Sequence, residues 1–373
     1  MKIDGPVMCG VGARPNLMKV APILRAFAAH APAIPARLAH TGQHYDHALD
    51  GQFFDVLGLP APDAHLGVGS GTHAVQTAQA MERFEPVLDA AQAGAVLVVG
   101  DVNSSLACAL VAAKKGVPVL HVEAGLRSGD WSMPEEINRV LIDRLSDLLF
   151  TTERSAADNL RREGIDPARV HFVGNVMIDS LRQHLPGAGA GRQVIARLDA
   201  SGLLPREGAY GVVTLHRPSN VDDAGTLKHL FAALAEAAVR LPLVFPVHPR
   251  TRARLEAAGL SPGAAGARIL LVPPLGYVDM LALMHDAALV LTDSGGMQEE
   301  ATALGVPCGT LRENTERPVT VSEGTNELVG RDRRRIVDLV ASTLAGGGKR
   351  GRVPELWDGR AAGRIAGIVA SLR

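Results

Sequence analysis

Carboxylates follow two consecutive apolar runs of the sequence. Asp101 comes after the run Ala95 to Val99, and Glu123 comes after the run Val117 to Val122. One helical crossover separates these runs, so a parallel sheet would bring both carboxylates to the same edge, where they can work together as acid and base. Glu135, next to a proline that favours a helix start, adds a third acidic group. These residues therefore predict proton-transfer chemistry at a sheet edge.

Each carboxylate also has a purely structural interpretation. Asp101 is placed where it can cap the next helix, which Asn103 and Ser104 can also cap. Glu123 can form a buried ion pair with an arginine such as Arg127. Glu135 complements the dipole of the helix that it begins. It is less expected that all three carboxylates have only a structural role than that any single one does.

A glycine-rich turn and two cations follow the first apolar run. The turn reads GVGARP at 10–15, contains Arg14, and leads into a predicted helix that carries Lys19. A helix N-terminus with two cations nearby suits a phosphate group. The pattern is neither a P-loop nor the dinucleotide-binding GxGxxG, because Pro15 takes the third glycine position. The alternative is an ordinary tight turn from strand to helix.

The second half of the sequence ends its apolar runs in groups that bind anions. His216 follows the run Gly211 to Leu215. A later strand is followed by a helix whose first residues are Ser294, Gly295 and Gly296. Free backbone N–H groups and a hydroxyl at such a helix start can hold a diphosphate. Glu300, one turn along, can accept both hydroxyls of a ribose, and Arg317 offers another cation beside the diphosphate.

The elements that must position these residues are short β-rich runs alternating with alanine-rich helical stretches. This alternation favours βαβ units and mostly parallel sheets, so the predicted fold class is α/β with two doubly wound halves. The strands predicted in the first half are Val7 to Val11, Ala36 to Ala39, Ala95 to Val99, Val117 to Val122, Leu148 to Thr151 and Val170 to Val173. Those predicted in the second half are Gly211 to Leu215, Leu243 to Val247, Ile269 to Val272, Ala288 to Thr292 and Val306 to Leu311.

The stretch LPGAGAGR at 185–192 lacks periodicity and concentrates Gly and Pro, which is typical of a connection. We therefore expect a first domain at 1–184 and a second at 185–355, with the ligand between them. Residues 356–373 contain an amphipathic stretch, 359–372, that predicts a terminal helix packing back on the first domain.

Composition excludes several functional classes. The 373 residues are 47% hydrophobic, which is typical of a globular protein. With 38 basic and 39 acidic side chains the formal charge is -1, so no global field recruits nucleic acid or an anionic membrane. No apolar stretch is long enough to span a membrane. The three cysteines lie in or beside apolar runs without metal-binding spacing, so we expect buried free thiols, no metal site and a cytoplasmic location. The polar segment Thr41 to Asp46 is expected to form a turn, and lining the cleft between the two domains is the alternative.

Eight segments, in order, resemble the non-hydrolysing UDP-N-acetylglucosamine 2-epimerase family. They are GARPNLMK, GDVNSS, HVEAGLRSGDWSMPEEINR, TLHRP, PVHPR, LTDSGGMQEEA, TERP and EGTN. The parts HVEAGLRS and DSGGMQEE are the most specific. The resemblance implies two Rossmann-like domains in the arrangement of GT-B glycosyltransferases, with a central interdomain cleft. It also implies a C-terminal helix that crosses back to the first domain, and a homodimer.

The resemblance also implies roles for individual residues. Those on the sugar side are Arg14 and Lys19, which would contact the diphosphate and sugar, and an acid/base cluster of Asp101, Glu123 and Glu135. Those on the nucleotide side are His216 and Arg317 at the departing diphosphate, Ser294, Gly295 and Gly296 at the phosphates, Glu300 at the ribose, and Leu275 and Met280 flanking the uracil.

The implied reaction interconverts UDP-GlcNAc and UDP-ManNAc at C2. UDP leaves C1 while a carboxylate removes the C2 proton, and UDP then adds back to 2-acetamidoglucal after protonation of the opposite face. The resemblance implies a UDP-sugar as the small-molecule partner and no cofactor, metal or nicotinamide.

Some positions depart from the family pattern. Val102 stands in place of a common Thr, and Leu275 and Met280 stand where other members carry Gln and Phe. The loop GDWSMPEE is shorter than in members that a second substrate molecule regulates. The alternatives are therefore a 2-epimerase of another nucleotide sugar such as a UDP-2,3-diacetamido uronate, a hydrolysing epimerase, a GT-B glycosyltransferase and an inactive UDP-sugar-binding relative.

Overall fold

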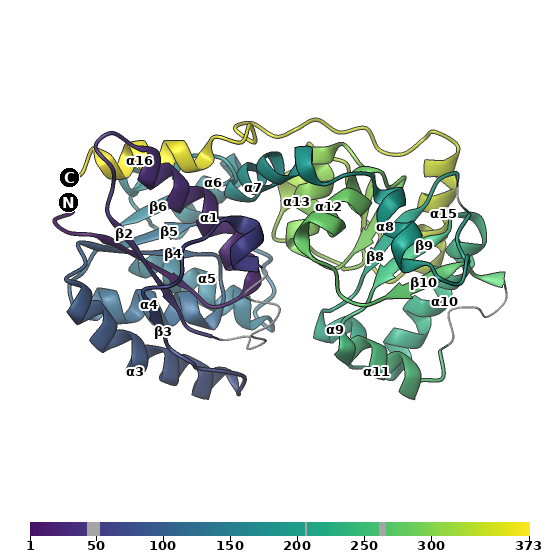
Figure 1. Cartoon of the computed structure of the whole chain (residues 1–373), viewed down its shortest axis with the longest axis horizontal. Helices are drawn as coiled ribbons and strands as arrows, with labels where there is room; N and C mark the ends of the chain where they lie inside the picture. Colours follow the sequence, from purple (N-terminus) through teal and green to yellow (C-terminus); the bar gives the residue numbers. More distant parts are fainter. Residues whose placement is uncertain (43–52, 206, 261–265) are drawn as a thin grey trace. The chain divides into compact units, whose positions relative to one another are not determined.

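The computed structural model describes residues 1–42, 53–205, 207–260 and 266–373, which form two compact units (Figure 1). Unit 1 comprises Met1–Arg182 and Glu355–Arg373, and unit 2 comprises Gln183–Pro354. From the sequence, we predicted that the first domain ends at 184 and the second at 355. Each unit is a parallel sheet with alternating helices, so the predicted α/β class and the two doubly wound halves are confirmed.

The described part of unit 1 contains a seven-stranded parallel sheet in the order β3-β2-β1-β4-β5-β6-β7. Its strands are β1 Val7–Val11, β2 Ala36–His40, β3 Ala64–His65, β4 Ala95–Val99, β5 Val119–Val122, β6 Leu148–Thr151 and β7 Val170–Phe172. Its helices are α1 Arg14–Ala29, α3 His73–Ala91, α4 Asn103–Lys114, α5 Pro134–Leu145, α6 Arg154–Arg162, the 3₁₀ turn η1 Pro167–Arg169, α7 Val176–His184 and α16 Ala361–Ala370. The central strands β1 and β4 are buried along their whole length, which explains their unbroken apolar sequence.

The described part of unit 2 contains a six-stranded parallel sheet in the order β10-β9-β8-β11-β12-β13. Its strands are β8 Gly211–Thr214, β9 Leu243–Pro246, β10 Ile269–Val272, β11 Leu289–Thr292, β12 Cys308–Thr310 and β13 Asn326–Leu328. Its helices are η2 Leu185–Gly187, α8 Gly191–Leu198, α9 Pro218–Val221, α10 Ala224–Arg240, α11 Pro249–Ala257, α12 Tyr277–His285, α13 Gly295–Leu304, α14 Pro318–Ser322 and α15 Arg333–Leu344. Both sheets reverse their strand order next to the first strand, and ligands of such sheets bind at that point.

The last residues of the chain return to unit 1. Helix α16 packs against α1, as the adjacent yellow and purple helices of Figure 1 show. Trp357 is 1% exposed and donates from its indole N–H to the carbonyl of Thr152 at 2.9 Å. The carboxylate of Asp179 accepts the first free amides of the helix, from Ala361 and Ala362, at 3.1 and 2.8 Å. Buried aromatic surface and a satisfied helix N-terminus thus attach this segment to unit 1.

Two of the secondary-structure predictions are wrong. The stretch 185–192, predicted as a connection, contains η2 and the first residues of α8. Val194 and Ile195 further along α8 are buried and supply the apolar face that this stretch itself lacks. Asn103 and Ser104, predicted as caps, lie inside α4, whose first flanking residue is Val102.

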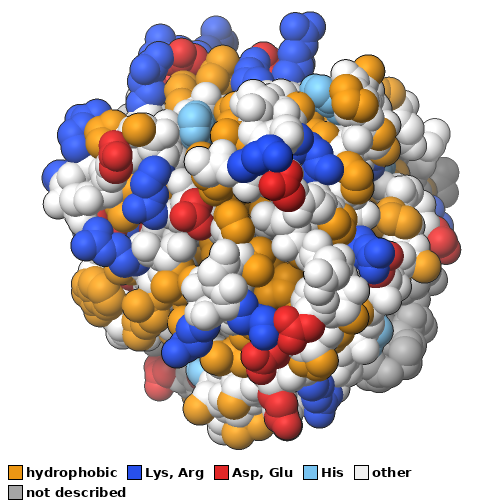
Figure 2. Space-filling view, turned by 90° about the vertical axis from the view of Figure 1, so that its left-hand side faces the viewer, with side chains coloured by type: hydrophobic (Ala, Val, Ile, Leu, Met, Phe, Trp, Pro, Cys, Tyr) orange, Lys and Arg blue, Asp and Glu red, His pale blue; other side chains and the backbone are white. Residues whose placement is uncertain are grey.

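Figure 2 shows one face of unit 1, on which basic, acidic and hydrophobic side chains are interspersed over the described residues. Every helix in the described part of the chain is too short or too polar to traverse a lipid bilayer. The predicted free thiols are confirmed, since Cys9, Cys108 and Cys308 are all buried and unbridged.

Candidate active site

The ends of β1, β4 and β5 lie side by side in the sheet of unit 1 and bring two of the predicted residues into contact. Glu123 is 6% exposed and forms an ion pair with the ammonium group of Lys19. A Cβ atom added to Gly100 would lie 3.1 Å from Lys19 Nζ and 3.2 Å from Glu123 Oε2. The pair therefore lies against the residue that precedes Asp101. The alternative partner of Glu123, Arg127, is wrong, because Arg127 pairs with Asp143 and Glu163.

Glu123 also has an unusual backbone. Its φ of 74° falls in the left-handed region, which costs a non-glycine residue about 1–3 kcal/mol. The amides of Glu123 and Ala124 both donate to the carbonyl of Phe150, at 3.0 and 3.1 Å, and hold this turn. Strain of this kind persists where the surroundings impose it and is common at active sites. It therefore agrees with a functional role for Glu123.

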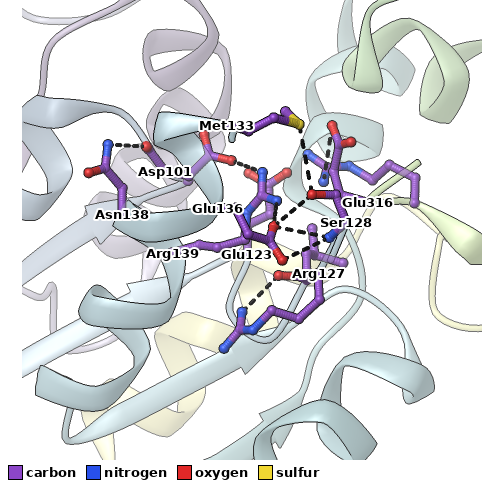
Figure 3. Close-up of polar contacts among 12 residues, drawn as sticks. Asp101, Glu123, Arg127, Ser128, Met133, Glu136, Asn138, Arg139 and Glu316 are labelled. Atoms are coloured by element: carbon purple, nitrogen blue, oxygen red, sulfur yellow. Dashed lines mark hydrogen bonds and ion pairs between the residues drawn. The ribbon is translucent and has the colours of Figure 1, made fainter. Parts of the chain in front are cut away.

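Asp101 is held by α5 from two directions (Figure 3). The guanidinium group of Arg139 pairs with its carboxylate, and the side-chain amide of Asn138 donates to its carbonyl oxygen at 2.9 Å. The carboxylate nevertheless keeps 25% of its side-chain surface exposed. The alternative that Asp101 caps α4 is wrong, because Val102 is the capping residue and the carboxylate faces Arg139.

The two adjacent glutamates of α5 have different environments. Glu136 is 2% exposed and accepts the amides of Ser128 and Gly129 at 3.0 and 2.9 Å, in addition to pairing with Arg139 (Figure 3). Burial opposes its ionisation, but these N–H donors and the charge of Arg139 outweigh burial and lower the pKa of Glu136. Glu136 thus fastens the preceding loop to α5. Glu135 is only half-buried in the first turn of α5.

The glycine-rich turn before α1 differs from the sequence expectation. The side-chain oxygen of Asn16 accepts the amides of Gly12 and Ala13 at 3.2 and 3.0 Å. These two amides are therefore engaged within the turn. Arg14 is half-buried with its guanidinium group 5.5 Å from the ring centre of Phe53, and Lys19 faces Glu123 as described.

In unit 2, the ends of β8 and β11 bring His216 and Asp293 together. His216 Nδ1 lies 2.8 Å from Asp293 Oδ1, and the backbone amides of His216 and Arg217 donate to the same carboxylate. Burial opposes ionisation of Asp293, but the charge of His216 and these hydrogen bonds lower its pKa. His216 is 51% exposed, and the pairing with Asp293 engages its Nδ1. Asp293 received no role from the sequence, although its position at a strand end was visible.

The residues predicted to bind phosphate, Ser294, Gly295 and Gly296, lie at the start of α13. Ser294 flanks the helix without forming a side-chain cap, so the amides of Gly295, Gly296 and the next residue have no capping partner from it. A Cβ atom at Gly295 would lie 2.5 Å from Glu316 Oε1, so the Glu316 side chain would have to shift to admit a larger residue. Backbone amides and the helix dipole at such a start favour phosphate oxygens.

Buried ion pairs surround the start of α13. Arg317 is 5% exposed and pairs with Glu299 at 2.8 Å, and Arg312 pairs with Glu316 at 2.9 Å. Arg217 lies 3.6 Å from the same Glu316 carboxylate. The sequence predicted a cation at Arg317 but missed its buried partner Glu299, which lies within α13, on the other side of β12 in the chain.

The residues predicted to contact the nucleoside lie on α13, on α12 and in the segment just before α12. Glu300 is 5% exposed beside the Tyr277 hydroxyl, and burial raises its pKa to about 7, although Tyr277 acts in the opposite direction. Glu300 Oε1 has no hydrogen-bond partner among the described residues. Leu275 and Met280 are half-buried, one before α12 and one within it.

The remaining sequence predictions concern a metal site and the segment Thr41 to Asp46. Within residues 1–42, 53–205, 207–260 and 266–373, no group of three or more His, Cys, Asp and Glu side chains is arranged to hold a metal. Of the segment Thr41 to Asp46, residues 43–46 lie outside the described residues. Thr41 itself bonds to Ser104 at 2.7 Å.

Residues 27–370 match the family model described as UDP-N-acetylglucosamine 2-epimerase. The chain belongs to this family. The resemblance recognised in the sequence is therefore confirmed.

Curated relatives of this epimerase family are similar over nearly their whole length. A UDP-N-acetylglucosamine 2-epimerase of Methanocaldococcus jannaschii is 42% identical over 337 residues, which cover 90% of this chain and 91% of the relative. A UDP-2,3-diacetamido-2,3-dideoxy-D-glucuronate 2-epimerase of Pseudomonas aeruginosa is 40% identical over 337 residues, covering 90% of this chain and 91% of that one.

Solved structures support the same family. The M. jannaschii UDP-GlcNAc 2-epimerase in complex with UDP-GlcNAc and UDP has a TM-score of 0.89 and 39% sequence identity, covering 99% of this chain and 100% of that one. A lipopolysaccharide outer core galactosyltransferase, at a TM-score of 0.53 and 13% identity, shares the fold alone.

Proposed function

We propose that this epimerase interconverts UDP-GlcNAc and UDP-ManNAc by elimination and re-addition of UDP. C2 of a nucleotide sugar has no adjacent carbonyl, so its proton is not acidic and simple deprotonation is unfavourable. In the proposed step, a carboxylate takes the C2 proton, the C1–C2 double bond forms, and the C1–O bond breaks with its electron pair leaving on UDP. Protonation of the other face of C2 and attack of UDP on C1 complete the inversion.

The observation that carries the proposal is the placement of Asp101 and Glu123 at adjacent strand ends of unit 1. One carboxylate retains exposure and the other is paired with a lysine, so the two have different environments, as an acid and a base require. Glu135 supplies a third, half-buried carboxylate. We assign Arg14 and Lys19 to the sugar and diphosphate side of the same site.

For the nucleotide, the proposal uses the start of α13 and its surroundings. Ser294, Gly295 and Gly296 bind the phosphates, His216 donates to the leaving diphosphate, and Arg317 adds positive charge. Glu300 accepts the ribose hydroxyls, and Leu275 and Met280 flank the uracil. Stabilisation of the leaving group by such fixed donors is a large contribution to catalysis.

Three further features belong to the proposal. The product is UDP-ManNAc. The location is cytoplasmic, which the three buried free thiols favour. The assembly is a homodimer, for which α5 offers exposed Ile137 and Leu141, one turn apart, and the nearby Trp131 at 63% exposure.

A second substrate is supported by one specific observation. The P. aeruginosa relative named for a UDP-2,3-diacetamido uronate is 40% identical to this chain, nearly as much as the M. jannaschii epimerase. The same elimination chemistry applies at C2 of that sugar, because the C3 substituent does not take part.

The test is an NMR time course of the protein with UDP-GlcNAc in deuterated buffer. We expect UDP-ManNAc carrying deuterium at C2, with return of labelled UDP-GlcNAc. Product without C2 deuterium would exclude elimination, and release of free ManNAc with UDP would indicate a hydrolysing enzyme. If UDP-GlcNAc is not turned over, turnover of the UDP-2,3-diacetamido uronate would identify that nucleotide sugar as the substrate.

A further inference from the structure

A buried histidine lies between the two proposed acid/base turns. His121 is the penultimate residue of β5 and is 0% exposed. Its Nδ1 lies 2.6 Å from Asp143 Oδ1, and its Nε2 lies 3.0 Å from the carbonyl oxygen of Gly100. Both neighbours are oxygens, so the ring connects α5 to the end of β4 through one nitrogen–oxygen contact on each side.

The other oxygen of Asp143 reaches the second turn. Asp143 is also 0% exposed, and its Oδ2 accepts the amide of Gly125 at 3.0 Å. The same oxygen lies 2.8 Å from the guanidinium group of Arg127. One carboxylate on α5 therefore holds both His121 and the loop that follows β5.

These contacts end next to the proposed acid/base residues. Gly100 directly precedes Asp101, and Gly125 is two residues beyond Glu123. Gly100 and Glu123 both have left-handed backbones, with φ of 64° and 74°, which the surroundings must hold in place. The amide of Gly100 also donates to the carbonyl of Val122 at 3.0 Å, so the two turns are directly joined.

We propose that His121 and Asp143 are positioning residues that fix the Asp101 and Glu123 turns relative to each other. This inference rests on the proposed function, because the pair matters for catalysis only if both carboxylates act on one sugar. Neither His121 nor Asp143 is accessible to substrate, so their effect passes through Gly100 and Gly125. A pair that merely stabilises the core would leave catalysis intact in the folded variant.

The kinetic test uses Asp143→Asn, which keeps the shape of the side chain and removes its charge, and His121→Gln as a second variant. A misplacement of about 1 Å can cost about 100-fold in rate. We therefore expect kcat for UDP-GlcNAc to fall about 100-fold in either variant, with KM and UDP binding unchanged. Unchanged kcat in variants with normal UDP binding would overturn the proposal.

Asp179→Asn is the matched control, because Asp179 is another buried carboxylate of unit 1 that accepts two backbone amides. Its amides belong to α16, so we expect lower thermal stability and normal kcat. An equal loss of kcat in the control would show that any weakening of unit 1 suffices, and would also overturn the proposal.

A structural measurement separates this inference from the proposed function. Crystal structures of the wild type and Asp143→Asn give the distance between the Asp101 and Glu123 carboxylates, which we expect to change by more than about 0.5 Å. An unchanged distance contradicts positioning even if every UDP-sugar proves inert. A wild type without turnover contradicts the proposed function and leaves this comparison valid. If Asp143→Asn does not fold, His121→Gln serves for both measurements.

Discussion

Asp101 and Glu123 show how neighbouring carboxylates acquire different properties from their partners. Glu123 is almost fully buried and balanced by Lys19, whereas Asp101 keeps an exposed edge and is balanced by Arg139. A buried charge must be paired because its desolvation is costly, and each cation meets this requirement for one carboxylate. The two carboxylates therefore differ in exposure and in the cation that balances them.

Asp101→Asn tests the proposed acid/base role directly. The amide keeps the size of the side chain but loses the charge, so we expect the epimerisation rate to fall at least ~100-fold, with UDP affinity unchanged. The assay is the C2 deuterium time course together with UDP titration. Asp147→Asn, which alters a carboxylate bonded to the Val119 amide of the same unit, is the control and should retain activity. Near-normal turnover of the Asp101 variant would remove this residue from the mechanism.

Glu300 predicts a pH dependence of nucleoside binding. Its pKa is raised to about 7 by burial, so the free protein carries a protonated carboxyl below that pH. Ribose hydroxyls donate most favourably to the ionised form, and binding must then release the proton. We expect uridine affinity to fall about tenfold for each pH unit below 7, because each unit reduces the ionised fraction tenfold.

The measurement is uridine titration by NMR between pH 8 and pH 5.5, since uridine has no phosphate that titrates in this range. Glu300→Gln is the control and should bind more weakly at pH 8 without the acidic decline. A decline of equal slope in both proteins would assign the pH effect to another group.

The positions of these carboxylates were predictable, but their partners were not. Residues that end consecutive parallel strands meet at one sheet edge, and this rule placed Asp101 beside Glu123 without a structure. Arg139 is 38 residues from Asp101, and Lys19 is 104 residues from Glu123. These pairings depend on how α5 and α1 pack against the sheet, which residue spacing does not specify.

Secondary-structure elements were most predictable where they are buried on both faces. β1, β4, β6 and β10 have the predicted bounds because their apolar runs are continuous. β3 and β13 were missed, since Ala64–His65 has only two residues and Asn326–Leu328 has two polar ones. Hydrogen bonds to a neighbouring strand, rather than an apolar pattern, define these edge strands.

The close approach of α4 to the turn before α1 predicts a strong effect at Gly12. A Cβ atom there would lie 2.0 Å from Ser104 Oγ and 2.6 Å from Thr41 Oγ1, which are hydrogen-bonded to each other. We expect Gly12→Ala to lower the free energy of unfolding by about 1–3 kcal/mol, the usual cost of overpacking. Denaturant unfolding gives this value.

Gly363→Ala in α16 is the matched control, because a Cβ atom there would meet no other atom within 4 Å. Since alanine favours helix more than glycine does, this change should stabilise the protein by up to about 1 kcal/mol. Equal effects of the two substitutions would contradict the close packing described at Gly12.

The whole chain divides into units with separate cores, so core substitutions should act locally. Trp357 is fully buried in unit 1 although it follows unit 2 in sequence, and Phe245 is fully buried in unit 2. We expect Trp357→Ala to cost about 3–5 kcal/mol and to lower hydrogen-exchange protection in unit 1. Phe245→Ala should lower protection in unit 2. Loss of protection confined to unit 2 in the Trp357 variant would contradict the assignment of the terminal segment.

The return of residues 355–373 to unit 1 has a consequence for biosynthesis. Unit 2 is continuous in sequence, whereas unit 1 is interrupted by it. A ribosome therefore releases all of unit 2 before Trp357 and α16 can reach their places beside residues 1–182. Until then, the surface of α1 that α16 covers stays exposed in the nascent chain. Unit 2 can therefore complete its folding before unit 1 does.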